Sequence, residues 1–469
     1  MSVEGEKPVV CIVGGGFSGV ALAWQLLNIL QRPTRIVLIN KGSQIGRGMA
    51  YGTPSPHHLL NVPAGRMGLS PDDEQGFLRY LHGLGLPFSG SDFVPRTLYG
   101  AYLERSLGEA RAAAEPRGME LILHNAGVTG IMQTADNQHE VVLDVGTSIT
   151  AKAVVLALGN FASKPPLQQP GLQWNESGLH VSAWAPAGFD VGGINDPVLL
   201  LGCGLTAFDV LLQLRHQGHR GTVTMLSRRG LLAQAHRQLE VAPPQGIVSQ
   251  DILQGVTSIR TMLRTVREMI RSAELQGHDW RDVIGGLRAA TPRLWKQLPV
   301  AERRRFLRHL APYWDTHRHR AAVPIARQVQ QELGSGILKI KAGRLLALRR
   351  EGESWQADIC GRGASGIQTL TAAMIVNCTG PSSDLESVKD PLISSLVQQG
   401  RLCADPIGIG VEVDEEYRLL DNKGAGQPGF FYVGPLLRAG LWEATAVPEL
   451  RMHAARAARI IKDQTSDKG

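Results

Sequence analysis

The glycine-rich segment Gly14-Gly15-Gly16-Phe17-Ser18-Gly19 is the first candidate for chemistry in the chain. It directly follows the apolar run 8–13 and precedes the almost wholly apolar stretch 20–30. This order predicts a buried strand, a tight turn and a helix, an arrangement that binds the pyrophosphate of a dinucleotide. We expect Gly14 to permit the turn, Gly16 to let the backbone approach phosphate, and Gly19 to let helix and strand pack closely. The helix N-terminus would then face the phosphates.

The residues after the next expected strand, 35–39, depart from this pattern. An acid usually follows that strand and binds the ribose hydroxyls, but this chain has Asn40 and Lys41 there. An asparagine can still form hydrogen bonds with a ribose. The departure therefore affects the ribose contact more than the site itself.

A second segment of the same kind is Gly202-Cys203-Gly204-Leu205-Thr206-Ala207, between the apolar run 197–201 and an expected helix, 208–216. The next expected strand, 222–226, ends at Ser227-Arg228-Arg229, where no acid stands. Two guanidinium groups at this place suit the 2′-phosphate of NADPH, because one arginine can donate two parallel hydrogen bonds to two oxygens of a phosphate. NADH remains an alternative, and so does the simpler interpretation that both arginines are only solvated.

A weak internal repeat indicates two copies of a dinucleotide-binding fold. The strand patterns 120–124, 140–145 and 153–158 precede Gly159, and the patterns 336–340, 355–360 and 373–378 precede Gly380. Each copy has a β-meander followed by a buried strand that ends in glycine. Such a glycine lets the backbone lie against a bound cofactor. The sequence therefore predicts an α/β protein with two Rossmann-like domains.

The composition narrows the function classes. The chain has 469 residues, 43% of them hydrophobic, and five cysteines without a C-x-x-C pair, which disfavours a zinc site or a redox-active disulfide. The net charge of +7 raises the question of nucleic acid, but the basic residues are scattered and fit an anionic ligand equally well. No apolar run reaches the length of about 18 residues that a membrane span needs. We therefore expect a cytoplasmic protein that binds neither nucleic acid nor membrane.

Four further segments give the chain a family resemblance. They are 46–53 (GRGMAYGT), 58–67 (HLLNVPAGRM), 93–100 (FVPRTLYG) and 442–451 (WEATAVPELR). With the two glycine-rich fingerprints, they make nearly the whole chain resemble bacterial FAD/NAD(P)-binding flavoproteins related to N-hydroxylating and Baeyer–Villiger flavin monooxygenases. One branch of that family consists of FAD-dependent urate hydroxylases, which make 5-hydroxyisourate.

The resemblance implies roles for residues in this chain. The segment 58–67 would pass the isoalloxazine ring, which makes His58, Asn61 and Met67 the candidate catalytic residues. Pro435 follows Gly434 at the late FAD strand, where such flavoproteins often carry aspartate. A proline cannot make the contact that the aspartate makes with the ribityl or phosphate groups of FAD. The FAD residues would be Gly14, Gly16, Phe17, Ser18, Gly19, Asn40, Lys41, Gly434 and Pro435. The strand-end glycines of the repeat, Gly159 and Gly380, are further candidates for contact with a bound cofactor. The NADPH residues would be Gly202, Gly204, Thr206, Ala207, Arg228 and Arg229.

A largely helical insertion is expected over residues 231–325, with helices near 252–271 and 301–310. It contains Asp315, His317 and His319, but two histidines at this spacing do not share a helix face as metal ligands. We expect no metal there, and either a structural ion-pair cluster or a contact with substrate or NADPH. Around it we expect an FAD-binding domain in two parts, 1–165 and 366–469, and an NADPH-binding domain in two parts, 166–230 and 326–365.

These expectations lead to one principal hypothesis and two alternatives. The first is an FAD-dependent, NADPH-consuming monooxygenase that hydroxylates a small molecule with O₂ through a C4a-(hydro)peroxyflavin, with urate the substrate that the resemblance suggests. The second is an NADPH-dependent reductase that passes electrons to an acceptor other than oxygen. The third is a flavin-bearing sensor or basic nucleic-acid binder with little turnover. The sequence leaves the oligomeric state open.

Overall fold

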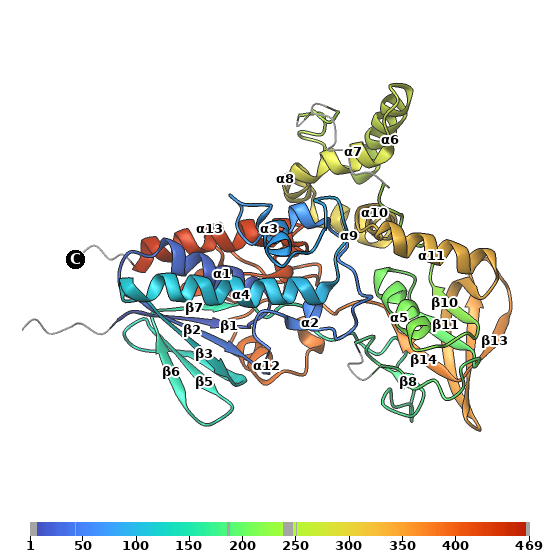
Figure 1. The fold of residues 1–469 in the computed structure, drawn as a ribbon, viewed down its shortest axis with the longest axis horizontal. Helices are drawn as coiled ribbons and strands as arrows, with labels where there is room; N and C mark the ends of the chain where they lie inside the picture. Colours follow the sequence, from blue (N-terminus) through green and yellow to red (C-terminus); the bar gives the residue numbers. More distant parts are fainter. Residues whose placement is uncertain (1–6, 43, 185–187, 238–246, 250, 466–469) are drawn as a thin grey trace, which may run out of the picture.

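Two separate sheets, each with its own hydrophobic core, form the two ends of the molecule (Figure 1). The computed structural model describes residues 7–42, 44–184, 188–237, 247–249 and 251–465. The predicted domain ranges also include 1–6, 43, 185–187, 238–246, 250 and 466–469, which lie outside the described residues. None of the helices in the described ranges is long and apolar enough to cross a membrane.

The first sheet has the strand order β15-β16-β7-β1-β2-β3, and all of its pairs are parallel except β15 with β16. Its strands are β1 (Val9–Val13), β2 (Arg35–Asn40), β3 (Glu120–Asn125), β7 (Ala153–Leu156), β15 (Arg418–Leu420) and β16 (Gly426–Tyr432). The strands β1 and β7 are buried along almost their whole length, because helices cover one face and a small sheet lies on the other.

The two faces of this sheet are covered differently (Figure 1). The helices α1 (Phe17–Ile29), α4 (Arg96–Ala114) and α13 (Val447–Thr465) pack side by side on one face. The other face carries α12 (Pro391–Gln398) and an antiparallel sheet of β4 (Val128–Gln133), β5 (His139–Leu143) and β6 (Ser148–Ala151). The apolar character of 20–30 all round thus reflects a helix buried between sheet and neighbouring helices.

The second sheet has the order β13-β12-β11-β10-β9-β14-β8. Its strands are β8 (Leu179–His180), β9 (Val198–Leu201), β10 (Val223–Ser227), β11 (Leu338–Glu351), β12 (Ser354–Gly361), β13 (Ile367–Ala372) and β14 (Met374–Asn377). The helices α5 (Leu205–His216) and α11 (Val323–Gly334) pack against each other and share its core.

The predicted repeat is visible in the strand orders. The order β3-β2-β1-β7 in the first sheet corresponds to β11-β10-β9-β14 in the second, and all of these pairs are parallel. The prediction of two Rossmann-like units in an α/β fold is therefore confirmed. In the first copy β3 belongs to the parallel sheet and the meander is separate, whereas in the second the long β11 serves in both.

The chain returns to the first domain later than predicted. Residues 367–377 form β13 and β14 in the second sheet, although the range 366–469 was expected in the FAD-binding domain. The reason is that β14 fills the place beside β9 that β7 fills beside β1. At the other boundary, α11 begins at Val323, just inside the predicted insertion, and packs with α5 in the second domain.

The insertion rises from the junction of the two domains as a group of helices with its own core (Figure 1). These are α6 (Ile259–Leu275), α7 (Trp280–Gly286), α8 (Thr291–Gln297), α9 (Val300–His309) and α10 (Ala311–Arg318). The first begins later than the expected 252–271, because Gly255 takes a left-handed φ of +74° and Ser258 is the extended N-cap residue.

The remaining helical segments are short. They are α2 (Gly48–Tyr51) and α3 (Gly76–Gly83), with 3₁₀ turns η1 (Ala64–Arg66), η2 (Glu115–Arg117), η3 (Leu287–Ala289), η4 (Leu385–Ser387) and η5 (Pro435–Ala439).

Candidate dinucleotide and active site

The first glycine fingerprint lies at the carboxyl end of β1, where the chain turns into α1. Gly14 has φ +115°, and a Cβ added to it would lie 2.2 Å from the carbonyl oxygen of Ala157. A Cβ on Gly19 would lie 1.9 Å from the carbonyl oxygen of Gly14. In contrast, the nearest atom to a Cβ on Gly16 is the Cα of Gly48, at 3.8 Å. The outer glycines therefore serve the protein's own packing, whereas Gly16 keeps space open in front of the helix.

The positive end of the helix dipole at the N-terminus of α1 is available to an anion. Gly16 is its N-cap residue, no side chain caps the helix, and its first turn contains no acid. Phe17 and Ser18 are buried as the first residues of the helix. The positive end of a 13-residue helix is therefore not neutralised by the chain at this point, which suits a phosphate group.

Asn40 holds the fingerprint loop in place. Its Oδ1 accepts a hydrogen bond of 3.1 Å from the backbone N–H of Gly15, and its Nδ2 donates one of 2.8 Å to the carbonyl oxygen of Gly42. Lys41 is exposed beside it. Asn40 was expected to take the place of the ribose acid, and the structure gives its amide a positioning role within the loop.

The second fingerprint repeats this geometry at the carboxyl end of β9. Gly202 has φ +130°, and an added Cβ would lie 2.4 Å from the carbonyl oxygen of Cys378. An added Cβ on Gly204 meets nothing within 4 Å. Gly204 caps α5, whose first turn also has neither a side-chain cap nor an acid, while Thr206 is half-buried and Ala207 fully buried.

The strands that return to the two fingerprints end in glycines with open surroundings. Gly159 (φ +69°) follows β7, and Gly380 (φ +90°) follows β14. A Cβ on either would meet nothing within 4 Å. Both positions therefore leave room for a ligand beside the backbone.

An arginine-rich cavity of about 460 Å³ lies beyond the end of β10. Arg228 and Arg229, the two arginines expected to bind NADPH, lie in its wall, and Arg229 donates a 2.8 Å hydrogen bond to the carbonyl oxygen of Arg308. No carboxylate is among the residues that line it, which are Arg228, Arg229, Arg308, His309, Gly343, Arg344, Cys360, Gly361 and Arg362. This cavity is a concentrated positive field, suited to a phosphate group.

Sequence reasoning missed three of these arginines. Arg344 stands opposite Cys360 in the β11–β12 pairing, so the hairpin delivers Arg344 and Arg362 to the cavity together. Arg308 comes from α9 in the insertion. No spacing in the sequence links these residues to Arg228 and Arg229.

His58 is buried at the junction of the two domains. Its Nδ1 lies 2.7 Å from the Thr53 hydroxyl oxygen, and its other ring nitrogen has no hydrogen-bond partner among the described residues. Burial lowers the pKa of His58. Arg96 of α4 forms a 2.9 Å ion pair with Asp209 of α5, which joins the domains beside this histidine.

The other two candidate catalytic residues differ in their surroundings. The backbone carbonyl oxygen of Asn61 lies 3.0 Å from His236 Nε2, so this segment contacts the start of the insertion. Met67 is 1% exposed and belongs to the first hydrophobic core. A side chain so enclosed has a packing role, and this position weighs against the expected catalytic role of Met67.

The segment after β16 leads from Gly434 and Pro435 into η5. Both residues are buried, and the N–H of Leu436 donates a 3.2 Å hydrogen bond to the hydroxyl oxygen of Tyr432. Pro435, which has no N–H, begins a turn whose next donor is already paired within the protein.

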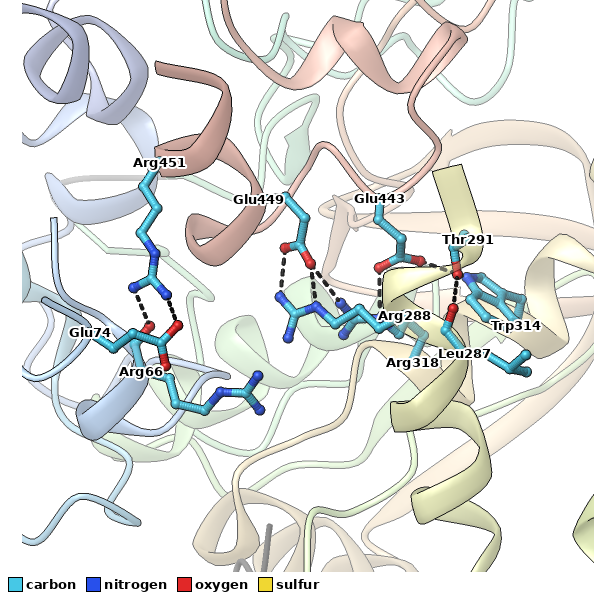
Figure 2. Close-up of polar contacts among 10 residues, drawn as sticks. All are labelled: Arg66, Glu74, Leu287, Arg288, Thr291, Trp314, Arg318, Glu443, Glu449 and Arg451. Atoms are coloured by element: carbon cyan, nitrogen blue, oxygen red, sulfur yellow. Dashed lines mark hydrogen bonds and ion pairs between the residues drawn. The ribbon is translucent and has the colours of Figure 1, made fainter. Parts of the chain in front are cut away.

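A cluster of buried charges joins the insertion to this part of the first domain (Figure 2). Arg288 donates to Glu449 at the start of α13, with one contact of 2.6 Å, and the Nε of Arg318 lies 2.6 Å from Glu443 Oε2. The indole N–H of Trp314 donates to the other oxygen of Glu443 at 3.1 Å (Figure 2). Because both partners of each pair are largely buried, breaking one pair would leave an uncompensated charge.

Two of the three titratable residues singled out in the insertion, Asp315 and His319, lie beside this cluster. Burial raises the pKa of Asp315 to about 6, with Arg438 opposing and Glu443 adding to the shift. Burial lowers the pKa of His319 to about 3. His317 places its Nδ1 2.8 Å from the carbonyl oxygen of Tyr313. Among the residues that the structure describes, no three metal-ligating side chains gather into a site.

Comparisons with known proteins agree with this architecture. A family model described as FAD-NAD(P)-binding matches residues 11–161. No curated protein sequence matches the chain. Among solved structures, ornithine N-hydroxylase from Kutzneria sp. 744, in a form with reduced FAD, NADP⁺ and L-ornithine, is similar at 14% identity and TM-score 0.63, with 98% of this chain and 100% of that chain covered.

Two further structures show the breadth of the fold. Cadaverine monooxygenase from Erwinia amylovora, bound to FAD, is similar at 15% identity and TM-score 0.62, over 96% of this chain and 94% of its own. Thioredoxin reductase from Lactococcus lactis is similar at 15% identity and TM-score 0.52, over 98% and 99%. Residues 11–161 thus match the FAD-NAD(P)-binding family model, and the whole chain shares its overall fold with these two monooxygenases and with thioredoxin reductase.

Proposed function

We propose that the protein is an FAD-dependent, NADPH-consuming monooxygenase that hydroxylates a small molecule with O₂. The observation that carries this proposal is the pair of uncapped helix N-termini, α1 and α5, each behind a glycine that leaves open space. Two such sites in one chain suit two dinucleotides, one of which delivers hydride to the other.

The residues at α1 fit FAD. Gly14, Gly16 and Gly19 would hold its pyrophosphate, Asn40 would fix the loop that contacts it, and Gly159 would let the backbone pass beside it. Bound and reduced FAD would supply the chemistry that activates O₂. The protein's part is to bind and orient the two nucleotides and the substrate, and to exclude water from the place where they meet.

The residues at α5 fit NADPH. Gly204 would face the pyrophosphate, and the arginine cavity would take the 2′-phosphate. Arg344 and Arg362 join Arg228 and Arg229 in this role, since all four line one cavity without a carboxylate. Each charge-assisted hydrogen bond contributes about 1.5–3 kcal/mol, enough to separate NADPH from NADH by tenfold or more.

The main alternative, a reductase, shares the same fold and must be separated by chemistry. A reductase that works through a dithiol needs an accessible thiolate. Burial raises the pKa of Cys378 and raises that of Cys11 to about 12, which keeps both as thiols. These two cysteines therefore do not favour disulfide chemistry.

The test begins with the absorption spectrum of the purified protein after incubation with FAD. Anaerobic NADPH should bleach the flavin, and air should restore it. Candidate substrates, beginning with urate because the resemblance suggests it, should then increase NADPH consumption and yield a hydroxylated product. Reduction that yields only hydrogen peroxide with every substrate, or rapid turnover only with artificial electron acceptors, would refute oxygen insertion. Failure to bind FAD would refute the proposal as a whole.

A further inference from the structure

The helical insertion contains an apolar cavity of about 530 Å³, which is within the size range of small-molecule sites. Its walls come from α6, α7, α8, α9 and α10, and its inner side is formed by Trp442 of the first domain. The aromatic residues among its lining are Trp295, Phe306, Tyr313, Trp314 and Trp442. The ring centres of Trp295 and Trp442 lie 4.6 Å apart, and the ring of Phe306 packs edge-on against both.

Three of the polar groups that line this cavity are already engaged within the protein, and the wall also contains the polar side chains of Arg267, Tyr313 and His317. The indole N–H of Trp295 donates to the carbonyl oxygen of Ala439 at 2.7 Å, and that of Trp314 donates to Glu443. The hydroxyl of Thr291 donates to the carbonyl oxygen of Leu287 at 2.9 Å (Figure 2). A compound rich in N–H and C=O groups would lose hydrogen bonds to water in this mainly apolar cavity and replace few of them, which disfavours its binding.

The cavity adjoins the segment that leads from the late FAD strand to α13. Trp442 lies between η5 and α13, and the guanidinium of Arg438 in η5 lies 4.7 Å from the centre of its ring. Glu443, the next residue, is held by Arg318 and Trp314 of the insertion. The same short segment thus forms the inner wall of the cavity and follows Gly434 at the end of the late FAD strand.

We propose that this cavity is the substrate chamber and that it takes an uncharged apolar compound, with an aromatic ring or an alkyl chain as the part that enters. This inference rests on the proposed monooxygenase function. In the balanced reaction, one atom of O₂ enters a C–H bond of the substrate as hydroxyl. The other atom leaves as water, with two electrons and a proton from NADPH and one proton from solvent. By the same reasoning, the chamber disfavours urate and zwitterionic amino acids.

The test measures binding directly, on the oxidised FAD-loaded protein without NADPH. The probe is N-phenyl-1-naphthylamine, an uncharged aromatic compound whose fluorescence rises in a dry apolar site. We expect one probe molecule per chain, with energy transfer from the tryptophans of the cavity. Uncharged aromatic compounds should displace the probe, whereas urate and L-ornithine should not.

Two matched variants locate the site. Ile270→Asp places a carboxylate in the cavity wall, whereas Leu275→Asp makes a comparable change on the same helix at a side chain that is 91% exposed. We expect Ile270→Asp to weaken probe binding tenfold or more and Leu275→Asp to leave it unchanged. A second cavity variant, Val266→Phe, adds volume without charge and should also weaken binding. Circular dichroism and FAD content show whether each variant folds.

Several results would overturn this inference. They are absence of probe binding, equal effects of the two aspartate variants, and displacement by urate. Self-association of the chain that excludes the probe would also overturn it, because a second copy would then occupy the cavity. Since binding is measured without NADPH or turnover, its failure is distinct from failure of the monooxygenase activity.

Discussion

The middle glycine of the second fingerprint allows a test that separates cofactor binding from folding. Gly204 has φ −87° and ψ −171°, an extended conformation open to any residue, and an added Cβ meets nothing within 4 Å. Alanine is a poorer N-cap than glycine, which lowers stability. It also reduces the conformational entropy of the unfolded chain, which raises stability by about 0.4–1 kcal/mol. Gly204→Ala should therefore change the free energy of unfolding by less than about 1 kcal/mol.

Gly202→Ala is the matched control, because it adds the same methyl group two residues earlier. Here φ is +130° and the methyl carbon would lie 2.4 Å from the carbonyl oxygen of Cys378. The backbone conformation alone costs about 1–3 kcal/mol for a non-glycine residue, and the overlap adds to that. With about 2–4 °C per kcal/mol in a domain of this size, Tm should fall by roughly 2–12 °C.

The assay is anaerobic flavin reduction as a function of NADPH concentration, combined with thermal unfolding. Gly204→Ala should bind NADPH about tenfold or more weakly, since even one lost charge-assisted hydrogen bond to phosphate costs about 1.5–3 kcal/mol. Its Tm and FAD content should match the wild type. If Gly204→Ala binds NADPH as the wild type does, the N-terminus of α5 does not face the pyrophosphate and our placement of NADPH is wrong.

Three further predictions concern single side chains. Arg362→Ala should raise KM for NADPH about tenfold and leave KM for NADH unchanged, and the control Arg350→Ala should change neither value. An equal rise in both KM values would show that the cavity does not recognise the 2′-phosphate. Glu443→Gln should lower the free energy of unfolding by up to about 3–5 kcal/mol in urea denaturation, because it removes the nearer of the two carboxylates that face the buried Arg318 and leaves only Glu449, at 3.8 Å. An unchanged midpoint would contradict this. The pKa of Asp315 is about 6 in the folded state, against an ordinary value of 3.8, so the folded state keeps a proton that the unfolded state loses between these pH values. The wild type should therefore become less stable as pH rises from about 4 to about 6, by up to about 3 kcal/mol. Asp315→Asn should remove this loss in a series of Tm measurements against pH, and a parallel pH profile in the two proteins would refute it.

The sequence predicted best those parts of the site that depend on neighbours along the chain. A strand, a glycine turn and a helix form one local unit, so the types and spacing of Gly14, Gly16 and Gly19 were sufficient to predict it. The structure separates their roles in a way the motif does not. Gly14 and Gly19 are required by contacts inside the protein, whereas Gly16 is free of them and open to a ligand.

Residues brought together from distant segments could not be predicted in this way. Arg344 and Arg362 reach the arginine cavity only because β11 and β12 pair in one register. Glu443 and Arg318 are separated by more than a hundred residues, and their pairing depends on how the insertion packs on the first domain. Met67 shows the converse case, since its place in a family segment predicted a catalytic role, whereas its burial favours a packing role.

The position of α9 connects the two parts of the proposed reaction. Arg308 and His309, at its end, line the arginine cavity, whereas Phe306 of α9 and Leu310, which follows it, line the apolar cavity. One short helix therefore forms a wall of both the proposed 2′-phosphate site and the proposed substrate chamber. Because packed side chains transmit displacement rather than absorb it, a shift of α9 on nucleotide binding would change the shape of the chamber. The insertion, which directly follows the NADPH arginines in the chain, thus places the nucleotide site and the chamber on opposite sides of the same helix.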